Sequence, residues 1–247
     1  MVERFEEGTP GKVVAVVLCA GQGSRMGAAV NKIFLELHKR PVILYALEVF
    51  ERTPEVDEIL LVSAAGEEPL LAELAQQNGC GKVRAVICGG ATRHGSEERA
   101  LAVLRDEIEA GLIEQVLIHD GARPFISVKQ IEALIERTRE VGGAMLAAPL
   151  TSDEQIVQVD QQQRIQGSFD REQIWKAQTP QAFQAAILLQ AYDQAAQTGF
   201  VGTDTASSVE RIGGRVAIVP SDAYNLKLTT PHDLVVAEKL LEARQWE

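Results

Sequence analysis

One stretch near the N-terminus decides the fold: VVAVVLCAGQGSRMG, residues 13–27. It joins a continuous apolar run, Val13 to Cys19, to a loop that contains three glycines. A run of this kind, rich in β-branched residues, is typical of a strand buried on both faces of a parallel sheet. A glycine-rich loop directly after the strand lets backbone amides face phosphate oxygens. The stretch therefore predicts an α/β fold with an anion site at the end of its first strand.

The rest of the chain alternates strand-like and helix-like segments. Further strands are expected at 58–62, 83–87, 115–119, 144–149 and 216–219, and helices at 41–51, 69–77, 99–108, 128–141, 182–196 and 231–244. This alternation predicts a mostly parallel, Rossmann-like sheet flanked by helices. Right-handed crossovers place the carboxyl ends of the strands, and any ligand, at one edge of such a sheet.

The pattern changes between residues 150 and 172. Ile156, Val157 and Val159 alternate with polar residues, and a polar tip at 160–163 follows. This segment predicts a β-hairpin arm that projects from the sheet, either as a surface excursion or as a dimerisation arm. We expect a flexible tail at 1–11 and a single domain over 12–247 that includes the arm.

Composition restricts the classes of partner. The formal net charge of the 247 residues is −11, which disfavours nucleic acids and anionic membranes as partners. No apolar run reaches the roughly 20 residues of a membrane span, and the acidic N-terminus lacks the features of a signal peptide. Three irregularly spaced cysteines, Cys19, Cys80 and Cys88, are typical of reduced thiols. These features predict a cytoplasmic protein that binds small anions in a pocket.

The glycine-rich loop matches neither of the two common phosphate-binding motifs. A P-loop closes with Gly-Lys-Ser or Gly-Lys-Thr, which is absent here. A dinucleotide loop needs glycine or alanine where this chain has Met26, and an acidic residue after the second strand, which residues 61–65 do not supply. The loop instead carries two cationic residues, Arg25 and Lys32, which suit a ligand with several adjacent phosphates.

At this point a resemblance to a known family becomes specific. Motifs occur in the family's order over nearly the whole chain, from about Val13 to Leu241: Ala20-Gly21-x-Gly23-x-Arg25-Met26, Lys32-x-Phe34-Leu35, Gly89-Gly90-Ala91-Thr92-Arg93 with Ser96, His119-Asp120-Gly121-Ala122-Arg123-Pro124, Asp170-Arg171 with Trp175, Gln178-Thr179-Pro180-Gln181, Thr203-Asp204-x-Ala206-Ser207 and Asn225-x-Lys227-x-Thr229. Together they resemble the 2-C-methyl-D-erythritol 4-phosphate cytidylyltransferases, nucleotidyltransferases of the non-mevalonate isoprenoid precursor pathway.

The resemblance implies that CMP moves from CTP to 2-C-methyl-D-erythritol 4-phosphate and that pyrophosphate is released. It implies catalytic roles for Arg25, Lys32, Asp120 and Lys227. It implies nucleotide binding by Ala20, Gly21, Gly23, Ser24, Arg25, Lys32, Gly89, Gly90, Ser96 and Asp120. It implies substrate binding by Arg123, Arg171, Thr179, Thr203 and Lys227.

The resemblance also implies a metal ion and a second copy of the chain. Asp120 follows the predicted strand at 115–119, where a hard carboxylate suits Mg²⁺ or another divalent metal that keeps its waters and bridges phosphates. Family members are homodimers in which the residue at Arg171 reaches the substrate phosphate of the neighbouring subunit. An arginine fork suits a phosphate because it binds two oxygens at once.

Two departures from the family pattern leave alternatives open. The family's Pro-x-x-Asp-Thr-x-Lys run is replaced by residues 149–155, Pro-Leu-Thr-Ser-Asp-Glu-Gln, and Ala91 replaces a frequent acidic residue beside the cytosine-reading glycines. The first departure concerns the acceptor, so a ribitol-5-phosphate cytidylyltransferase is the alternative enzyme. The alternative of another class is a catalytically silent homologue that binds nucleotide. Retention of Arg25, Lys32, Asp120, Arg171 and Lys227 argues against it.

Overall fold

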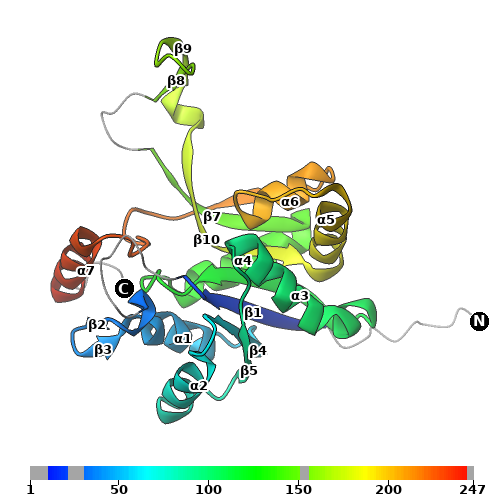
Figure 1. Cartoon of the computed structure of the whole chain (residues 1–247), viewed down its shortest axis with the longest axis vertical. Helices are drawn as coiled ribbons and strands as arrows, with labels where there is room; N and C mark the ends of the chain where they lie inside the picture. Colours follow the sequence, from blue (N-terminus) through cyan, green and yellow to red (C-terminus); the bar gives the residue numbers. More distant parts are fainter. Residues whose placement is uncertain (1–10, 22–30, 151–155, 244–247) are drawn as a thin grey trace, which may run out of the picture.

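A computed structural model gives the structure of the protein and describes residues 11–21, 31–150 and 156–243. Its centre is a sheet of seven strands in the order β11-β7-β10-β6-β1-β4-β5 (Figure 1). The strands are β1 (Lys12–Cys19), β4 (Glu58–Ser63), β5 (Val83–Cys88), β6 (Ile113–Asp120), β7 (Gly143–Pro149), β10 (Trp175–Gln184) and β11 (Ala217–Pro220). Only β10 is antiparallel to its neighbours in this sheet, so the predicted mostly parallel sheet is confirmed.

Helices cover both faces of the sheet, which explains why the run Val13 to Cys19 is apolar throughout. Successive side chains of a strand point to opposite faces. Val13, Ala15 and Val17 face one core cluster, which includes α1 (Val42–Arg52), α2 (Glu68–Gln77) and α4 (Val128–Val141). Val14 and Val16 face the other, which includes α3 (Arg93–Glu109), α5 (Ala185–Thr198) and α6 (Thr205–Arg211). All five of these β1 side chains are at most 2% exposed.

A third cluster lies beside the sheet and secures the segment that carries Lys227. Here α7 (Pro231–Ala243) packs over the short hairpin of β2 (Glu36–Leu37) and β3 (Arg40–Pro41). Leu228 is fully buried in this cluster, and its backbone N–H donates to the carbonyl of Ala122 at 2.9 Å. The segment before α7 is thereby held against the loop that follows β6. No described helix combines the length and apolar character that crossing a bilayer requires.

Two predicted helix boundaries were wrong. Residues 182–184 belong to strand β10, and α5 begins only at Ala185. Ala182 and Phe183 pack into opposite core clusters, which is the two-residue period of a strand. Helix α3 begins at Arg93, six residues before the predicted start at 99, because Thr92 caps it by accepting a hydrogen bond from the N–H of Gly95.

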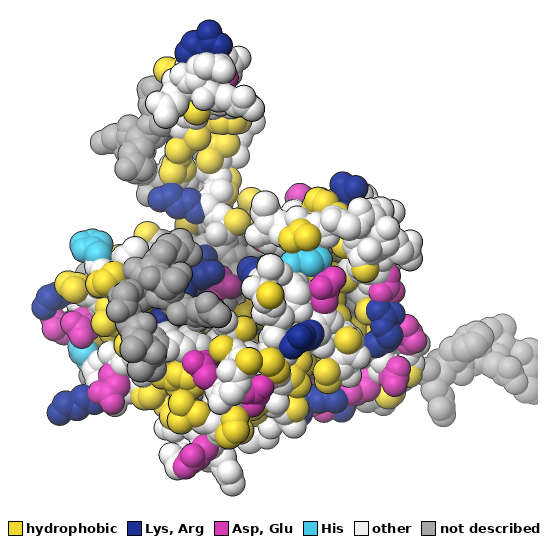
Figure 2. Space-filling model, in the orientation of Figure 1, with side chains coloured by type: hydrophobic (Ala, Val, Ile, Leu, Met, Phe, Trp, Pro, Cys, Tyr) yellow, Lys and Arg dark blue, Asp and Glu magenta, His cyan; other side chains and the backbone are white. Residues whose placement is uncertain are grey.

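The predicted arm is confirmed as a projecting hairpin. Strands β8 (Val157–Val159) and β9 (Ile165–Ser168) pair antiparallel at the top of Figure 1, away from the main sheet. Apolar side chains are exposed along it (Figure 2), namely Val157, Val159, Ile165 and Phe169. The division into a tail at 1–11 and one domain over 12–247 stays a prediction, and residues 1–10 and 151–155 lie outside the described part.

Candidate active site

A cavity of about 530 Å³ lies at the carboxyl ends of β1, β4, β5 and β6. This is the sheet edge at which the sequence predicts a ligand. Eight of the predicted site residues line it: Ala20, Gly21, Lys32, Gly89, Gly90, Ser96, Asp120 and Lys227. Gly23, Ser24 and Arg25 lie outside the described residues.

The segment 89–96 forms one wall of the cavity. The N–H of Gly89 donates to the Ser63 carbonyl at 2.7 Å, which continues the pairing of β5 with β4. The Ser96 hydroxyl accepts from the N–H of Gly90 at 3.1 Å and donates to the Thr92 carbonyl at 3.0 Å. A Cβ on Gly90 would lie 2.5 Å from the carbonyl carbon of Gly95. Only glycine therefore fits here, and the wall is held by hydrogen bonds within the segment itself.

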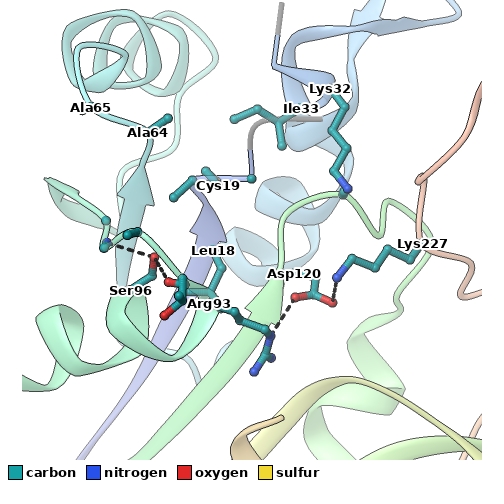
Figure 3. Close-up of a pocket in the computed structure, with 17 residues that line it drawn as sticks. Leu18, Cys19, Lys32, Ile33, Ala64, Ala65, Arg93, Ser96, Asp120 and Lys227 are labelled. Atoms are coloured by element: carbon teal, nitrogen blue, oxygen red, sulfur yellow. Dashed lines mark hydrogen bonds and ion pairs between the residues drawn. The ribbon is translucent and has the colours of Figure 1, made fainter. Parts of the chain in front are cut away.

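The opposite wall carries Lys32, which Asn31 anchors to the end of β1. The buried Asn31 amide donates to the carbonyl of Cys19 at 2.8 Å and to Glu67 Oε2 at 2.7 Å. Lys32 then begins the short helix η2 (Lys32–Phe34). The amines of Lys32 and Lys227 both reach toward the part of the cavity that contains Asp120 (Figure 3).

Asp120 lies among three cations. Its carboxylate contacts Lys227 Nζ at 2.8 Å, Arg93 Nε at 3.4 Å and Arg123 Nε at 3.6 Å, and its side chain is 10% exposed. Burial alone would raise the pKa of Asp120, but Lys227 and Arg93 hold it far below its ordinary value. The carboxylate is therefore charged at every pH at which the protein would work.

A single carboxylate of the described cavity lining, that of Asp120, is chemically suited to a hydrated metal ion, and its metal-binding role stays a prediction. Among the described residues that line the cavity, Asp120 alone is acidic. Within the described part of the chain, no group of three or more His, Cys, Asp or Glu side chains is placed to hold a metal ion. Mg²⁺ that keeps its waters and also binds substrate phosphates needs only one such carboxylate, whereas a protein cage needs several.

Arg123 lies beside the cavity and lines a second one. The second cavity has a volume of about 600 Å³ and shares Lys227 with the first. Besides its contact with Asp120, Arg123 donates from Nη1 to the Asn225 carbonyl at 2.7 Å, which fixes the segment that leads to Lys227. Arg123 thus links Asp120 to Lys227, and its predicted contact with substrate stays a prediction.

Three predicted substrate residues lie elsewhere. Thr179 is buried behind Asp120, and its hydroxyl accepts from the Asp120 N–H at 3.0 Å. Thr203 is exposed just before Asp204, which caps α6. Arg171 is exposed in the short helix η3 (Arg171–Gln173) at the base of the arm. None of these three lines the first cavity, so their substrate-binding roles stay predictions.

Arg93 is a cavity residue that was not among the predicted site residues. It lines the cavity and contacts Asp120, and it also pairs with Glu97 one helical turn later. The signal in the sequence is the spacing of Arg93 and Glu97, since residues four apart on a helix are neighbours. Placing the start of the helix at 99 hid this pair.

His119 lies in the core behind Asp120, and its burial makes the stability of the fold depend on pH. Its ring is fully buried, with Nε2 at 3.1 Å from the Arg123 carbonyl and Nδ1 at 3.2 Å from the Thr179 hydroxyl. Burial lowers the pKa of His119 to about 3. The unfolded chain, with a histidine pKa of about 6.5, therefore binds a proton that the folded chain rejects between these two values.

The stability that His119 contributes is present above pH 6.5 and is lost as pH falls toward 3, at about 1.4 kcal/mol per pH unit. Between pH 7 and pH 5, we expect the free energy of unfolding of His119→Gln to fall by about 2 kcal/mol less than that of the parent protein. Urea unfolding at pH 7, 6 and 5 measures the difference. Parallel pH dependences of the two proteins would show that the native histidine takes up the proton.

Comparisons with known proteins all point to one family. The family model described as IspD, 2-C-methyl-D-erythritol 4-phosphate cytidylyltransferase, matches residues 13–243. A relative of that name from Bacillus licheniformis is 42% identical over 230 residues, 93% of this chain and 96% of the relative. The solved 4-diphosphocytidyl-2C-methyl-D-erythritol synthase of Anaerococcus prevotii superposes with a TM-score of 0.82 at 26% identity, over 94% of this chain and 97% of that chain. The Thermus thermophilus cytidylyltransferase gives 0.71 at 30% identity, over 92% and 98%.

Proposed function

The chain belongs to the 2-C-methyl-D-erythritol 4-phosphate cytidylyltransferase family, and we propose that its reaction takes place in the cavity at the carboxyl edge of the sheet. The protein is a cytidylyltransferase that transfers CMP from CTP to 2-C-methyl-D-erythritol 4-phosphate and releases pyrophosphate, a step of isoprenoid precursor synthesis. The proposed location of the reaction rests on one observation: Lys32, Asp120 and Lys227 converge opposite the wall at 89–96.

Each wall of the cavity suits a different part of CTP. The segment 89–96 offers backbone groups that suit the hydrogen-bonding edge of the cytosine, and the Ser96 hydroxyl holds that segment in place through Gly90 and Thr92. Lys32 and the backbone at Ala20 and Gly21 suit the triphosphate. Arg25, outside the described residues, is proposed to add a second cation there.

The transfer is one displacement at the α-phosphorus. A phosphate oxygen of the acceptor forms a bond to that phosphorus as its bond to the bridging oxygen of pyrophosphate breaks, and pyrophosphate leaves with the electron pair. Such transfers need alignment and charge neutralisation more than covalent help. Lys32 and Lys227 would neutralise the negative charge that grows on the α-phosphate oxygens. Asp120 would hold Mg²⁺, which supplies further charge neutralisation when bound.

The acceptor would enter from the side of the second cavity. Arg123 and Lys227, both paired with Asp120, line this space, as does Lys176 on β10, so the lining carries positive charge that suits an anionic substrate. Arg171 would come from the arm of a second copy of the chain. The exposed apolar residues of the arm support the proposal of a homodimer, because two such arms would bury one another's apolar surface.

A cytoplasmic location is part of the same proposal. The acidic chain, with a sequence pI near 5.0, suits a protein that meets its small substrates in the cytoplasm. Its three irregularly spaced cysteines are typical of reduced thiols in such a compartment.

The acceptor is tested by turnover with two purified compounds. Pyrophosphate release from CTP and Mg²⁺ is measured with 2-C-methyl-D-erythritol 4-phosphate and with ribitol 5-phosphate at equal concentrations. We expect kcat/KM to favour the first acceptor at least about a hundredfold, because the two compounds carry the same phosphate but differ in the length, branching and hydroxyl positions of the carbon chain that the site must fit. A preference for ribitol 5-phosphate would overturn this choice, and no release with either acceptor would favour a silent homologue.

A further inference from the structure

A buried carboxylate lies behind the active site and touches none of the space in which the substrates would react. Glu97 is on α3, one turn after Arg93, and is 1% exposed. It accepts hydrogen bonds from Arg93 Nη1, from the Tyr192 hydroxyl on α5 and, at 2.8 Å, from the Thr205 hydroxyl on α6. Three helices therefore meet at one acidic group.

A carboxylate in this position is costly to the fold. Burial raises the pKa of Glu97, because removing a charged group from water is unfavourable. The neighbouring residues of α3 that face the core, such as Ala100, Leu101 and Leu104, are apolar, so an apolar side chain would also suit the helix. Replacing buried ion pairs by apolar residues is often neutral or stabilising. A contribution to stability is thus a weak explanation for Glu97.

The explanation lies in what Glu97 does to Arg93. The guanidinium reaches Glu97 and the Thr205 hydroxyl (3.2 Å) through Nη1. Through Nε it reaches Asp120 Oδ1 (3.4 Å), the contact marked by a dashed line in Figure 3. Because Glu97 and Thr205 hold the tip of the long Arg93 side chain, they also fix the position of its Nε. Glu97 also offsets the positive charge of Arg93. The negative charge of Asp120 is then offset less by Arg93 and attracts other cations more strongly.

We propose that Glu97 is a positioning residue which, with Tyr192 and Thr205, holds the guanidinium of Arg93 against Asp120 and so fixes the carboxylate that faces the reacting groups. This inference rests on the proposed role of the cavity. Glu97 does not line the cavity and touches Asp120 only through Arg93.

The first test is Glu97→Gln, which keeps size and hydrogen bonding but removes the charge. We expect kcat to fall about tenfold to a hundredfold, as for other residues that orient a catalytic group from behind. The KM for CTP should change much less, because the walls that hold the nucleotide stay intact. The matched control is Glu98→Gln, the next residue of α3, whose side chain is 44% exposed and which we expect to behave as the parent protein does.

The decisive test moves the carboxylate to another residue. The Thr205 hydroxyl is within hydrogen-bond distance of both Arg93 Nη1 and Glu97 Oε1, so an aspartate at 205 would reach the same guanidinium. Glu97→Gln with Thr205→Asp should recover most of the kcat lost by Glu97→Gln alone. A merely structural role does not predict recovery of kcat by a carboxylate from a different helix.

Thermal unfolding of all variants separates folding from catalysis. Parent-like kcat in a folded Glu97→Gln protein would overturn the inference, and so would a double variant that regains stability without regaining activity. If Glu97→Gln alone does not fold, the folded double variant is compared with the parent, and an inactive one overturns the inference. Acceptor-dependent turnover by the parent protein tests the proposed function separately.

Discussion

Lys32→Ala is expected to lower kcat for pyrophosphate release by about 10²–10³-fold, which corresponds to about 3–4 kcal/mol of transition-state stabilisation. Lys32 lines the cavity and reaches toward Asp120, where the α-phosphate of CTP would lie. The charge on that phosphate grows only as the new bond forms, so its partner contributes more in the transition state than in the bound substrate. Steady-state turnover at saturating CTP and acceptor measures the loss.

The control for Lys32→Ala is a lysine far from the cavity. Lys239 lies on α7 and forms a surface pair with Glu242, with 71% of its side chain exposed. Lys239→Ala should leave kcat and KM unchanged, because a pair this exposed contributes little. A Lys32→Ala protein with a raised KM for CTP and an intact kcat would mean that Lys32 binds the ground state and transition state equally. Its proposed catalytic role would then be wrong.

Mixed dimers of Lys32→Ala and Arg171→Ala chains are expected to regain activity that neither variant has alone. If each site combines Lys32 of one chain with Arg171 of the other, a mixed dimer has one site with both residues intact and one with neither. Random re-association makes half of the dimers mixed, so about a quarter of the parent activity should return. Arg171 is exposed at the base of the projecting arm, where a second copy could receive it.

The mixing experiment carries its own controls. Each variant is dissociated and re-associated with itself, and two different affinity tags allow mixed dimers to be isolated before assay. Isolated mixed dimers should have about half of the parent activity per dimer, since one of two sites is intact. Inactive mixed dimers would mean that each site takes both residues from one chain.

The sequence predicted the parallel part of the sheet well, because buried parallel strands have a local signature. The apolar run Val13 to Cys19 needs no partner to be recognised, and its two faces were later found in two core clusters. Strand β10 was missed because its polar segment at 178–181 does not alternate in the pattern of a strand. Gln178 and Gln181 are nevertheless buried, and their side chains bond to other loops, which no local pattern reveals.

The sequence predicted those residues of the candidate site that belong to a motif near the carboxyl end of a strand. One cavity is lined by Lys32, Gly89, Gly90 and Asp120, because parallel strands have their carboxyl ends at the same edge of the sheet. The contact between Arg93 and Asp120 joins residues 27 positions apart and depends on where α3 begins. The burial of Thr179 behind Asp120 depends on the antiparallel pairing of β10 with β6. Both are tertiary effects that residue identity alone does not determine.

The proposed location of the reaction is tested most directly by a crystal structure of the protein with Mg²⁺ and a non-hydrolysable CTP analogue. We expect the cytosine against the wall at 89–96, the triphosphate beside Lys32, and the α-phosphate on the side of the cavity that Asp120 and Lys227 share. A nucleotide bound outside this cavity, or one whose α-phosphate lies away from Lys32 and Asp120, would show that the proposed location is wrong.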